Sequence, residues 1–416
     1  MMKIFLKICF GVLLFLQSQF ASSQTTIDQT LSQFNSKFDQ ENERRFQQRG
    51  YNLTISSSSL NAYFGQLLNN FVPSPETPST NRFTATLANE ENSFDFGLNW
   101  DLRKGDLTKP LGLIVYTGVK VVSEKQNSLL SILDTDEVNS SVGFDLRFNF
   151  FLQNNLKIFG KKLWWRRFQG TSGSGNKVKN FRANKLSEKV KSKLKDKEDV
   201  EEKEVENTIV TEVADYISKN NLIDDAHVYW VNLSVFIPFN EVDYTYIEST
   251  EVFDEDNELT ENFYNARFSA SINGLYQKRK MIFSGTIGFS YSNNNNILTE
   301  ELTKKKFVNF PDNPDSQFLP LNEKEIFSGQ YNQFWTPQIE GEFTSILFLQ
   351  SFGVSAAFEK NLGPDYDALN WRLGIPVSLK DKDGKKTINF ELQWRELNGN
   401  NFVGFRVGKS FGAFIN

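Results

Sequence analysis

Apolar and polar residues alternate strictly over long stretches of this chain. Near the C-terminus, Leu369, Trp371 and Leu373 alternate with Asn370 and Arg372, and the same period continues to residue 380. A period of two residues is that of a β-strand with one apolar and one polar face. Many of the alternating runs are longer than the roughly five or six residues of an ordinary globular strand, and they suit a tilted strand that crosses a bilayer. The pattern therefore predicts that lipid covers the apolar face.

Residues 81–416 are predicted to form an all-β, transmembrane, antiparallel up-and-down barrel of about fourteen strands, within a range of about 12–16. The predicted strands are residues 82–88, 93–103, 112–122, 141–153, 155–168, 226–238, 241–248, 263–277, 280–292, 338–348, 352–361, 367–380, 385–397 and 401–414. The pattern is weakest in 82–88, 155–168 and 241–248, and without two of these the count is twelve. Four aromatic pairs near strand ends are expected to mark the membrane interfaces: Trp164-Trp165, Tyr229-Trp230, Tyr244 with Tyr246, and Phe334-Trp335.

The connections between these strands alternate in length. Outer-membrane barrels have short turns on the periplasmic side and longer loops outside. The short connections are residues 382–384, 349–351, 278–279, 239–240 and 154, and the long ones include 124–140, 169–225, 249–262 and 293–337. Asp383-Gly384 is a tight-hairpin signal. We therefore predict that the first set is periplasmic and the second extracellular.

One long loop, residues 169–225, interrupts the strand pattern. Residues 184–220 within it are helical in character, with a Lys-rich half followed by a Glu-rich half. An apolar stripe at helical spacing then includes Ile209, Val213 and Ile217. The ordinary interpretation is a solvated helix in an extracellular loop. The functional alternative is a surface helix that docks a partner or caps the barrel mouth.

Two segments precede the barrel. Residues 1–23 have a charged start, an apolar run and the small residues Ala21-Ser22-Ser23, which together predict a cleaved signal peptide. Residues 24–80 do not alternate, and Ile27, Leu31, Phe34 and Phe38 share one face of a predicted helix. This segment is expected either to plug the lumen or to lie in the periplasm. A flexible leader with one surface helix is the plainer alternative.

Composition narrows the class of protein. After residue 23 no run approaches eighteen consecutive apolar residues, so no transmembrane helix is predicted. Aromatic residues reach 14% although the chain is hydrophilic on average, as expected where only alternate residues face lipid. The net charge of -5 argues against nucleic acid as a partner. The only cysteine, Cys9, lies in the predicted signal, which excludes disulfides and thiol catalysis in the mature chain.

The polar faces of the predicted strands supply the candidate functional residues. If the apolar faces meet lipid, these side chains line the lumen, where they can set selectivity in an open pore or pair and close it. The lumen-lining candidates are Asp95, Asn99, Asp101, Arg103, Asp145, Arg147, Arg267, Glu340, Glu342, Arg372, Glu391, Arg395 and Arg406.

Catalytic and metal-binding patterns are largely missing from the sequence. His227 is the only histidine, whereas catalytic triads and histidine-rich metal sites need histidine at defined positions. The acidic run at residues 254–258 lacks the glycine and spacing of an EF-hand and is interpreted as a solvated loop. We therefore predict no enzymatic activity, no metal and no cofactor.

The end of the chain carries a resemblance to a known class. Val403, Phe405 and Val407 alternate with polar or small residues, and Phe414 lies two residues before the end. This resembles the aromatic-ended C-terminal strand of bacterial outer-membrane proteins. The cleavage region and the composition, rich in Phe, Asn and Lys, are similar to outer-membrane proteins of the Bacteroidetes group. The resemblance implies the outer membrane of a Gram-negative cell envelope, with membrane lipid and the barrel assembly machinery as partners.

Four functions remain open at this point. The leading one is porin-like or transporter-like passage or binding of a small solute through a polar lumen. The first alternative is a non-conducting outer-membrane anchor whose extracellular loops bind a partner or a surface component. The others are a soluble secreted β-sandwich and an enzyme embedded in the membrane.

Overall fold

The computed structural model is a closed antiparallel barrel of twelve strands. It describes residues 25–43, 55–69, 77–88, 93–123, 140–152, 156–158, 161–195, 197, 200–248, 258–309, 322–348, 351–380 and 386–411. In wall order the strands are β1 (Phe83–Ala88), β2 (Ser93–Asp101), β3 (Leu113–Ser123), β4 (Ser140–Phe151), β8 (Ile223–Pro238), β11 (Arg267–Lys278), β12 (Met281–Asn295), β15 (Gln333–Phe348), β16 (Phe352–Asn361), β17 (Leu369–Lys380), β18 (Lys386–Leu397) and β19 (Asn400–Phe411). The pairing of β1 with β19 closes the ring. The predicted signal peptide, the Asp383-Gly384 turn, Phe414 and most of the acidic run at 254–258 lie outside the described residues.

The walls are built from the alternation seen in the sequence. Large apolar side chains on the outward face are exposed, among them Ile287 at 71% and Val403 at 74%. Their neighbours along the strands point inward and are mostly buried polar residues. Continuous exposed apolar surface of this kind is typical of transmembrane β-barrels. The predicted fold class, an antiparallel barrel within the range of about 12–16 strands, is confirmed.

The predicted strand at 155–168 is not a wall strand. Its residues form β5 (Leu156–Ile158), β6 (Lys161–Leu163) and the first part of β7 (Arg166–Gly170). The β5–β6 pair is a separate two-stranded sheet. β7 pairs with the first half of β8, beyond the point where the pairing of β4 with β8 ends at Phe151 and Trp230. This prediction was wrong because short strands outside the wall show the same period of two.

The predicted strand at 241–248 exists, but it belongs to another sheet. β9 (Val242–Ile247) pairs with β10 (Leu259–Phe263) and, in parallel, with β14 (Asn322–Ser328), which in turn pairs with β13 (Thr303–Asn309). This four-stranded sheet has its own small core, in which Tyr244 packs against Phe263. Tyr244 is therefore buried in that core, and Trp230 is buried inside the barrel. The expectation that these two aromatics mark a membrane interface is wrong.

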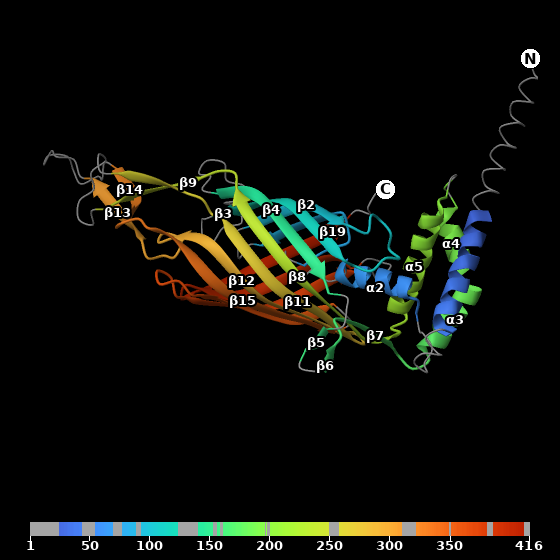
Figure 1. The fold of residues 1–416 in the computed structure, drawn as a ribbon. Coiled ribbons are helices and arrows are strands. Elements are labelled where there is room, and N and C mark those ends of the chain that lie inside the picture. Colours follow the sequence, from blue (N-terminus) through green and yellow to red (C-terminus); the bar gives the residue numbers. More distant parts are fainter. Residues whose placement is uncertain are drawn as a thin grey trace, which may run out of the picture.

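Because the segment 155–168 is not a wall strand, the helical insertion lies at the other end of the barrel from the one predicted. β4 ends and β8 begins at the same end as the short Arg279-Lys280 turn, so residues 169–225 lie at the end predicted to be periplasmic. The prediction that this insertion lies at the end opposite the short turn at residues 278–279 was therefore wrong. Residues 239–240 likewise move to the opposite end, where the four-stranded sheet lies. Figure 1 shows the helices and the β9, β13 and β14 strands at opposite ends of the barrel.

The helices beyond the barrel form one packed unit, here called the helical unit. It comprises α3 (Ser174–Asn184), α4 (Leu186–Leu194), α5 (Glu202–Lys219) and the helix at 25–43 (Figure 1). The predicted apolar stripe of α5 is buried in its core. Arg182 of α3 hydrogen-bonds to Asn35 at 2.7 Å and lies 3.8 Å from the ring centroid of Phe38, which attaches the N-terminal helix. None of the described helices has the length and apolar character needed to span a bilayer.

The charge run of the helical unit is paired rather than merely solvated. The Glu212 side chain is only 4% exposed and forms ion pairs with Lys189 and Lys193 of α4. Burial by itself raises the pKa of Glu212, but the hydrogen bonds and charges of Lys193 and Lys189 outweigh it and hold the pKa below the ordinary value of 4.5. Glu212 therefore joins α4 to α5 in its charged form.

This pairing predicts acid sensitivity of the helical unit. A carboxyl group with a lowered pKa in the folded state stabilises that state above its unfolded pKa, and the contribution is lost as pH falls through the folded pKa. We expect the protection factors of the α5 amides, which compare the measured exchange rate with the intrinsic rate at the same pH, to fall below about pH 4.5. In Glu212→Gln the fall should be smaller, because the group that titrates is gone. Equal acid dependence in both proteins would contradict the assignment.

Candidate functional site

The candidate residues lie in the barrel interior. Of the thirteen lumen-lining candidates, twelve are on inward-facing positions of wall strands, and Arg103 lies in the turn that follows β2. The structure divides them by depth. Eight line a cavity at one end of the barrel: Asp145, Arg147, Arg267, Glu340, Glu342, Arg372, Arg395 and Arg406. The other five, Asp95, Asn99, Asp101, Arg103 and Glu391, are buried and do not line this cavity.

The cavity, here called the mouth cavity, has a volume of about 480 Å³. Its rim includes Ser93 at the start of β2, Val122 near the end of β3 and Leu397 at the end of β18, which places it at the end opposite the helical unit. Its charged lining consists of Lys120, Arg147, Arg267, Arg372, Arg395 and Arg406 on the positive side, and Asp145, Glu340, Glu342, Glu359 and Glu396 on the negative side. A concave site with many charges of both signs can hold a small charged solute.

Two ion pairs stand on the wall of the mouth cavity. Arg267 of β11 reaches across β12 to Glu340 of β15, with a nitrogen–oxygen distance of 2.7 Å. Arg372 of β17 reaches across β16 to Glu342 of β15 at 2.9 Å. These side chains are 13–36% exposed, so they are partly accessible from the cavity. They give the cavity charged walls without filling it.

A more deeply buried cluster forms one side of the mouth cavity. Arg147 forms ion pairs with both Asp95 and Asp145, and all three side chains are at most 6% exposed. The hydroxyl of Tyr116 donates a hydrogen bond to Asp95, and the guanidinium of Arg147 lies 4.5 Å from the Tyr116 ring centroid. One cation thus holds two carboxylates from neighbouring parts of the wall, β2 and β4.

Two glycines make room for this cluster. A Cβ atom at Gly97 or Gly118 would lie 2.6 Å from the Cζ atom of Tyr116, which is too close for any side chain. The Tyr116 ring therefore lies flat against the wall, with Arg147 on its other face. Coverage of a glycine backbone by an aromatic ring in a neighbouring strand is a known device of β-sheets.

Amide and hydroxyl groups fill the next layer of the interior. Asn232 donates to Asn149 at 2.9 Å, and Thr286 donates to Asn273 at 2.8 Å. Asn149, Asn232 and Asn273 are at most 3% exposed. Hydrogen bonds such as these offset the cost of burying amide and hydroxyl groups. The layer connects the charged mouth with the opposite end.

At the opposite end the interior becomes apolar and a helix packs against it. α2 (Ser57–Asn69) begins where the Ser56 hydroxyl accepts a hydrogen bond from the Ser59 backbone N–H, as an N-cap. Inward-facing side chains from six neighbouring strands form what we call the apolar arc: Ile114, Phe151, Trp230, Leu275, Ile282 and Ile346. These residues and the buried face of α2 share one hydrophobic cluster.

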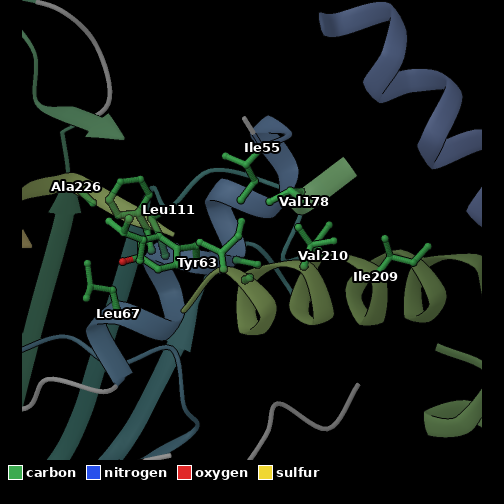
Figure 2. Packing of buried hydrophobic residues seen from close by; sticks show 14 of the residues in the cluster. Ile55, Tyr63, Leu67, Leu111, Val178, Ile209, Val210 and Ala226 are labelled. Carbon is green, nitrogen blue, oxygen red and sulfur yellow. The ribbon is translucent and has the colours of Figure 1, made fainter. Parts of the chain in front are cut away.

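Specific contacts fix α2 in this position. The Tyr63 hydroxyl donates a hydrogen bond of 2.7 Å to Gln277, an inward-facing residue of β11. Figure 2 shows Tyr63 close to Leu111 and Ala226, while Val210 of α5 packs into the same cluster. Gln66 donates to Asp215 of α5 at 2.8 Å. α2 is thus joined on one side to the barrel interior and on the other to the helical unit.

Basic residues support α2 from the turn region. Arg103 forms a bidentate ion pair with Asp101, with nitrogen–oxygen distances of 2.6 and 3.0 Å. Arg166 of β7 donates to Asn61 of α2 at 2.6 Å and lies 4.4 Å from the ring centroid of Phe64. The Arg103 guanidinium lies beside α2, with its Nη2 atom 3.6 Å from the position of a Cβ atom at Gly65, and neither Asp101 nor Arg103 lines the mouth cavity.

Other chemical possibilities have little support within the described ranges. No group of three metal-ligating side chains occurs among those residues. His227 faces outward on β8, and its Nε2 lies 3.0 Å from the Trp164 carbonyl oxygen. The sequence reasoning did not select Lys120 and Glu359, although their positions on predicted strands share the inward alternation. It also missed α2, whose apolar residues Tyr63, Phe64, Leu67 and Leu68 recur at helical spacing.

Comparisons with known proteins give limited further information. No family model matches the chain, and no curated protein matches it. Among solved structures the chain is similar to the β domain of the Bordetella autotransporter BrkA, at 9% sequence identity and a TM-score of 0.29, with 79% of this chain and 98% of that chain covered. A similarity of this size carries no argument about function. The strand pairing itself shows the fold, which is a closed antiparallel β-barrel of the outer-membrane type with a polar interior.

Proposed function

We propose that this protein lies in the outer membrane and binds a small charged solute in the mouth cavity, from which passage is controlled by α2. The observation that carries the proposal is the mouth cavity itself, a space of about 480 Å³ lined by eleven charged side chains inside a barrel. Charged side chains inside a barrel select solutes by size and charge and need no chemical reaction. The function is therefore solute recognition, followed by gated passage.

The exposed apolar band supports the membrane location, and the connections support an orientation. Outer-membrane barrels have short periplasmic turns and longer outer loops. The end that carries the helical unit has the two-residue turn at Arg279-Lys280, and β1 begins and β19 ends there. The mouth end has one equally short turn, Asn398-Gly399, and the insertion between β4 and β8 is a long connection at the helical end. The mouth end carries the four-stranded sheet. In the proposed orientation the mouth cavity opens to the outside, and α2 with the helical unit faces the periplasm.

The packing of α2 supports gating rather than permanent passage. A barrel of twelve strands falls between small barrels filled by side chains and large barrels with an open channel, so an added helix can decide whether a path exists. Here α2 covers the apolar arc, and Phe64 and Leu68 are fully buried. The proposal requires that α2 be displaced, and that the buried amide layer of Asn149, Asn232 and Asn273 separate, for a solute to leave the mouth cavity toward the helical end.

Filling the mouth cavity tests solute recognition. Ser269 lines the cavity, whereas its neighbour Ala270 faces outward on the same strand. We expect isothermal titration calorimetry on the purified mature protein to detect binding of at least one of three charged probes, triglycine, succinate or putrescine. Ser269→Trp should abolish this binding because the indole occupies the cavity, and Ala270→Trp should leave it unchanged. Failure of all three probes to bind, or equal binding in the two variants, would contradict the proposal.

A second candidate function is that of a non-conducting anchor that displays the four-stranded sheet. This sheet has a separate core of Val242, Tyr244, Phe263 and Ile297 and stands beyond the barrel wall at the mouth end. A surface element with its own core can bind a partner without any solute path. Absence of both solute binding and conductance under every condition would favour this candidate.

A further inference from the structure

We propose that β5, β6 and the start of β7 bind anionic phospholipid headgroups at the end of the barrel that carries the helical unit. This part of the chain, residues 156–158 and 161–167, is here called the interfacial segment, and it lies outside the closed wall. The inference rests on the membrane location proposed above and adds the class of lipid that this end of the protein recognises. It is independent of what the mouth cavity binds.

The interfacial segment combines aromatic and basic residues in one short run. Trp164 and Trp165 follow Lys161-Lys162-Leu163 and precede Arg166-Arg167. Tryptophan is enriched at membrane–water interfaces because one part of its ring system is apolar and another donates a hydrogen bond. Clustered Lys and Arg beside a membrane attract anionic headgroups. The composition of the run is therefore that of an interfacial lipid site.

The strand register gives the β5–β6 hairpin one mostly apolar face and one basic face. The first face carries the pairs Leu156–Leu163 and Ile158–Lys161, and the second carries the pair Lys157–Lys162. Elements with an apolar and a basic face lie in the plane of an anionic membrane surface, as amphipathic helices do. In Figure 1 the hairpin stands to the side of the barrel wall, near the end where the helices lie.

The two tryptophans lie at the edge of the exposed apolar band of the barrel. The Trp165 ring packs edge-to-face on Tyr229, with ring centroids 5.9 Å apart, and the Trp164 carbonyl oxygen lies 3.0 Å from Nε2 of His227. His227 and Tyr229 are successive outward-facing residues of β8, and further along the same face Leu233 is exposed. Trp164 itself is 45% exposed. The interfacial segment thus continues the band at the level where headgroups are expected.

The charge of this region is of one sign. Residues 152–170 contain five basic residues and no acidic one. Arg166 is turned inward, where it donates to Asn61 of α2. Arg167 is exposed and donates to the neutral amide oxygen of Gln169 at 3.2 Å. Within the described part of the chain Arg167 has no carboxylate partner, so its charge is available to a ligand.

The acidic residues on the neighbouring strand do not cancel this charge. Asp224 and Asp225, at the start of β8, lie 3.1 and 3.9 Å from Nζ of Lys278. Asp224 also pairs with Arg279, and Lys280 in the same turn is exposed. Basic residues of the β11–β12 turn therefore neutralise both carboxylates, and the surface beside the interfacial segment does not repel an anion.

An anionic glycerophospholipid fits these features. Its phosphodiester accepts hydrogen bonds from guanidinium and ammonium groups, and its glycerol region lies at the depth where tryptophan rings gather. Each basic side chain beside an anionic surface strengthens binding about fivefold. Phosphatidylcholine carries the same phosphodiester together with a quaternary ammonium, so a comparison with it separates recognition of charge from general affinity for lipid.

The test measures the binding of two lipids to the purified mature protein by native mass spectrometry from detergent micelles. We expect dioleoylphosphatidylglycerol to bind at least fivefold more tightly than dioleoylphosphatidylcholine, which has the same acyl chains. Lys162→Gln combined with Arg167→Gln should reduce this preference to less than twofold. Lys177→Gln combined with Lys179→Gln is the matched control, because it removes the same charge from exposed positions of α3, and it should leave the preference unchanged.

A variant of the exposed tryptophan separates the apolar from the charged contribution. Trp164→Ala should weaken both lipids by a similar factor of at least two, since the ring contributes apolar contact and no net charge. The ratio of the two affinities should stay as in the unsubstituted protein. Loss of the preference for phosphatidylglycerol in Trp164→Ala would contradict the assignment of that preference to Arg167 and the lysines.

The outcomes separate this inference from the proposed membrane location. If the two lipids bind within twofold of each other, or if the α3 variant loses the preference as fully as the Lys162 and Arg167 variant, the inference is wrong and the membrane location stands. Tighter binding of lipopolysaccharide than of phosphatidylglycerol, lost in the same double variant, would also overturn it, because the segment would then lie in the outer leaflet. If the mature protein stays in solution without detergent and binds neither lipid, both are wrong.

Discussion

Replacing Arg147 with alanine is expected to destabilise the barrel by about 3–5 kcal/mol, because Asp95 and Asp145 would remain buried with the cation that joins them removed. The cost arises from uncompensated charge and not from lost volume. The free energy of unfolding, measured by urea titration of the refolded protein in detergent, reports it directly.

Two further variants isolate this cause. The combined variant Arg147→Met, Asp95→Asn and Asp145→Asn removes all three charges and should recover most of the lost stability. Lys360→Ala breaks an exposed ion pair with Asp367 and should cost no more than about 1 kcal/mol. If Arg147→Ala lies within 1 kcal/mol of the unsubstituted protein, or the combined variant is no more stable than Arg147→Ala, the cluster does not hold the wall as described.

Truncating the buried face of α2 is expected to open a path through the barrel. Phe64 and Leu68 are fully buried against the apolar arc and the helical unit, and each truncation to alanine in such a core costs about 2–5 kcal/mol. The double variant Phe64→Ala and Leu68→Ala should therefore release α2 while the twelve-stranded wall stays closed. Single-channel recordings in planar bilayers should show steady conductance in the variant and none in the unsubstituted protein.

A control within the helical unit distinguishes the release of α2 from general weakening. Val190 of α4 is also fully buried, but it lies in the helical unit and not on α2. Val190→Ala should destabilise that unit and should show no conductance in planar bilayers. Conductance in Val190→Ala equal to that of the α2 double variant would assign the closure to the whole helical unit instead of α2.

The wall of the barrel was predictable because its pattern is local. In every wall strand the alternation decides which residues face outward, and twelve of the thirteen lumen candidates therefore occupy inward positions. Strand membership was less predictable. β9 has the same alternation as a wall strand, yet its partners are β10 and β14, and the β14 pairing joins segments some 80 residues apart in the chain. A period of two identifies a strand and says nothing about the sheet to which it belongs.

The end of the barrel at which a connection lies can be predicted only if the number of wall strands before it is counted correctly. Counting 155–168 as a wall strand reversed the side of the helical insertion, and counting 241–248 restored the correct side for the segments that follow. The two errors cancel beyond residue 248, which explains why the later turns were placed correctly. A single short strand outside the wall is thus enough to reverse the orientation assigned to a loop.

The plug helix α2 and the ion pairs of the mouth cavity were predictable in part. A helical apolar period is present at Tyr63, Phe64, Leu67 and Leu68. The Ser-rich and Pro-rich segments on either side are typical of loops, and they favour an irregular structure for the whole region. The role of α2 as a plug depends on the apolar arc, which is assembled from six strands and has no local sequence signal. The ion pairs Arg267–Glu340 and Arg372–Glu342 likewise depend on register, which the sequence alone does not determine.

The central claim is that α2 closes one end of a barrel whose other end is an open charged mouth. The mature chain contains no cysteine if residues 1–23 are removed, so thiols can be placed without background at Tyr63 and Gln277, whose side chains are in contact. The decisive measurement is the single-channel conductance of the Phe64→Ala and Leu68→Ala protein that also carries Tyr63→Cys and Gln277→Cys, joined by a short bis-maleimide linker with a reducible bond. We predict no conductance while the linker is intact and steady conductance after its reduction. Equal conductance before and after reduction, or no conductance in both states, would contradict this claim.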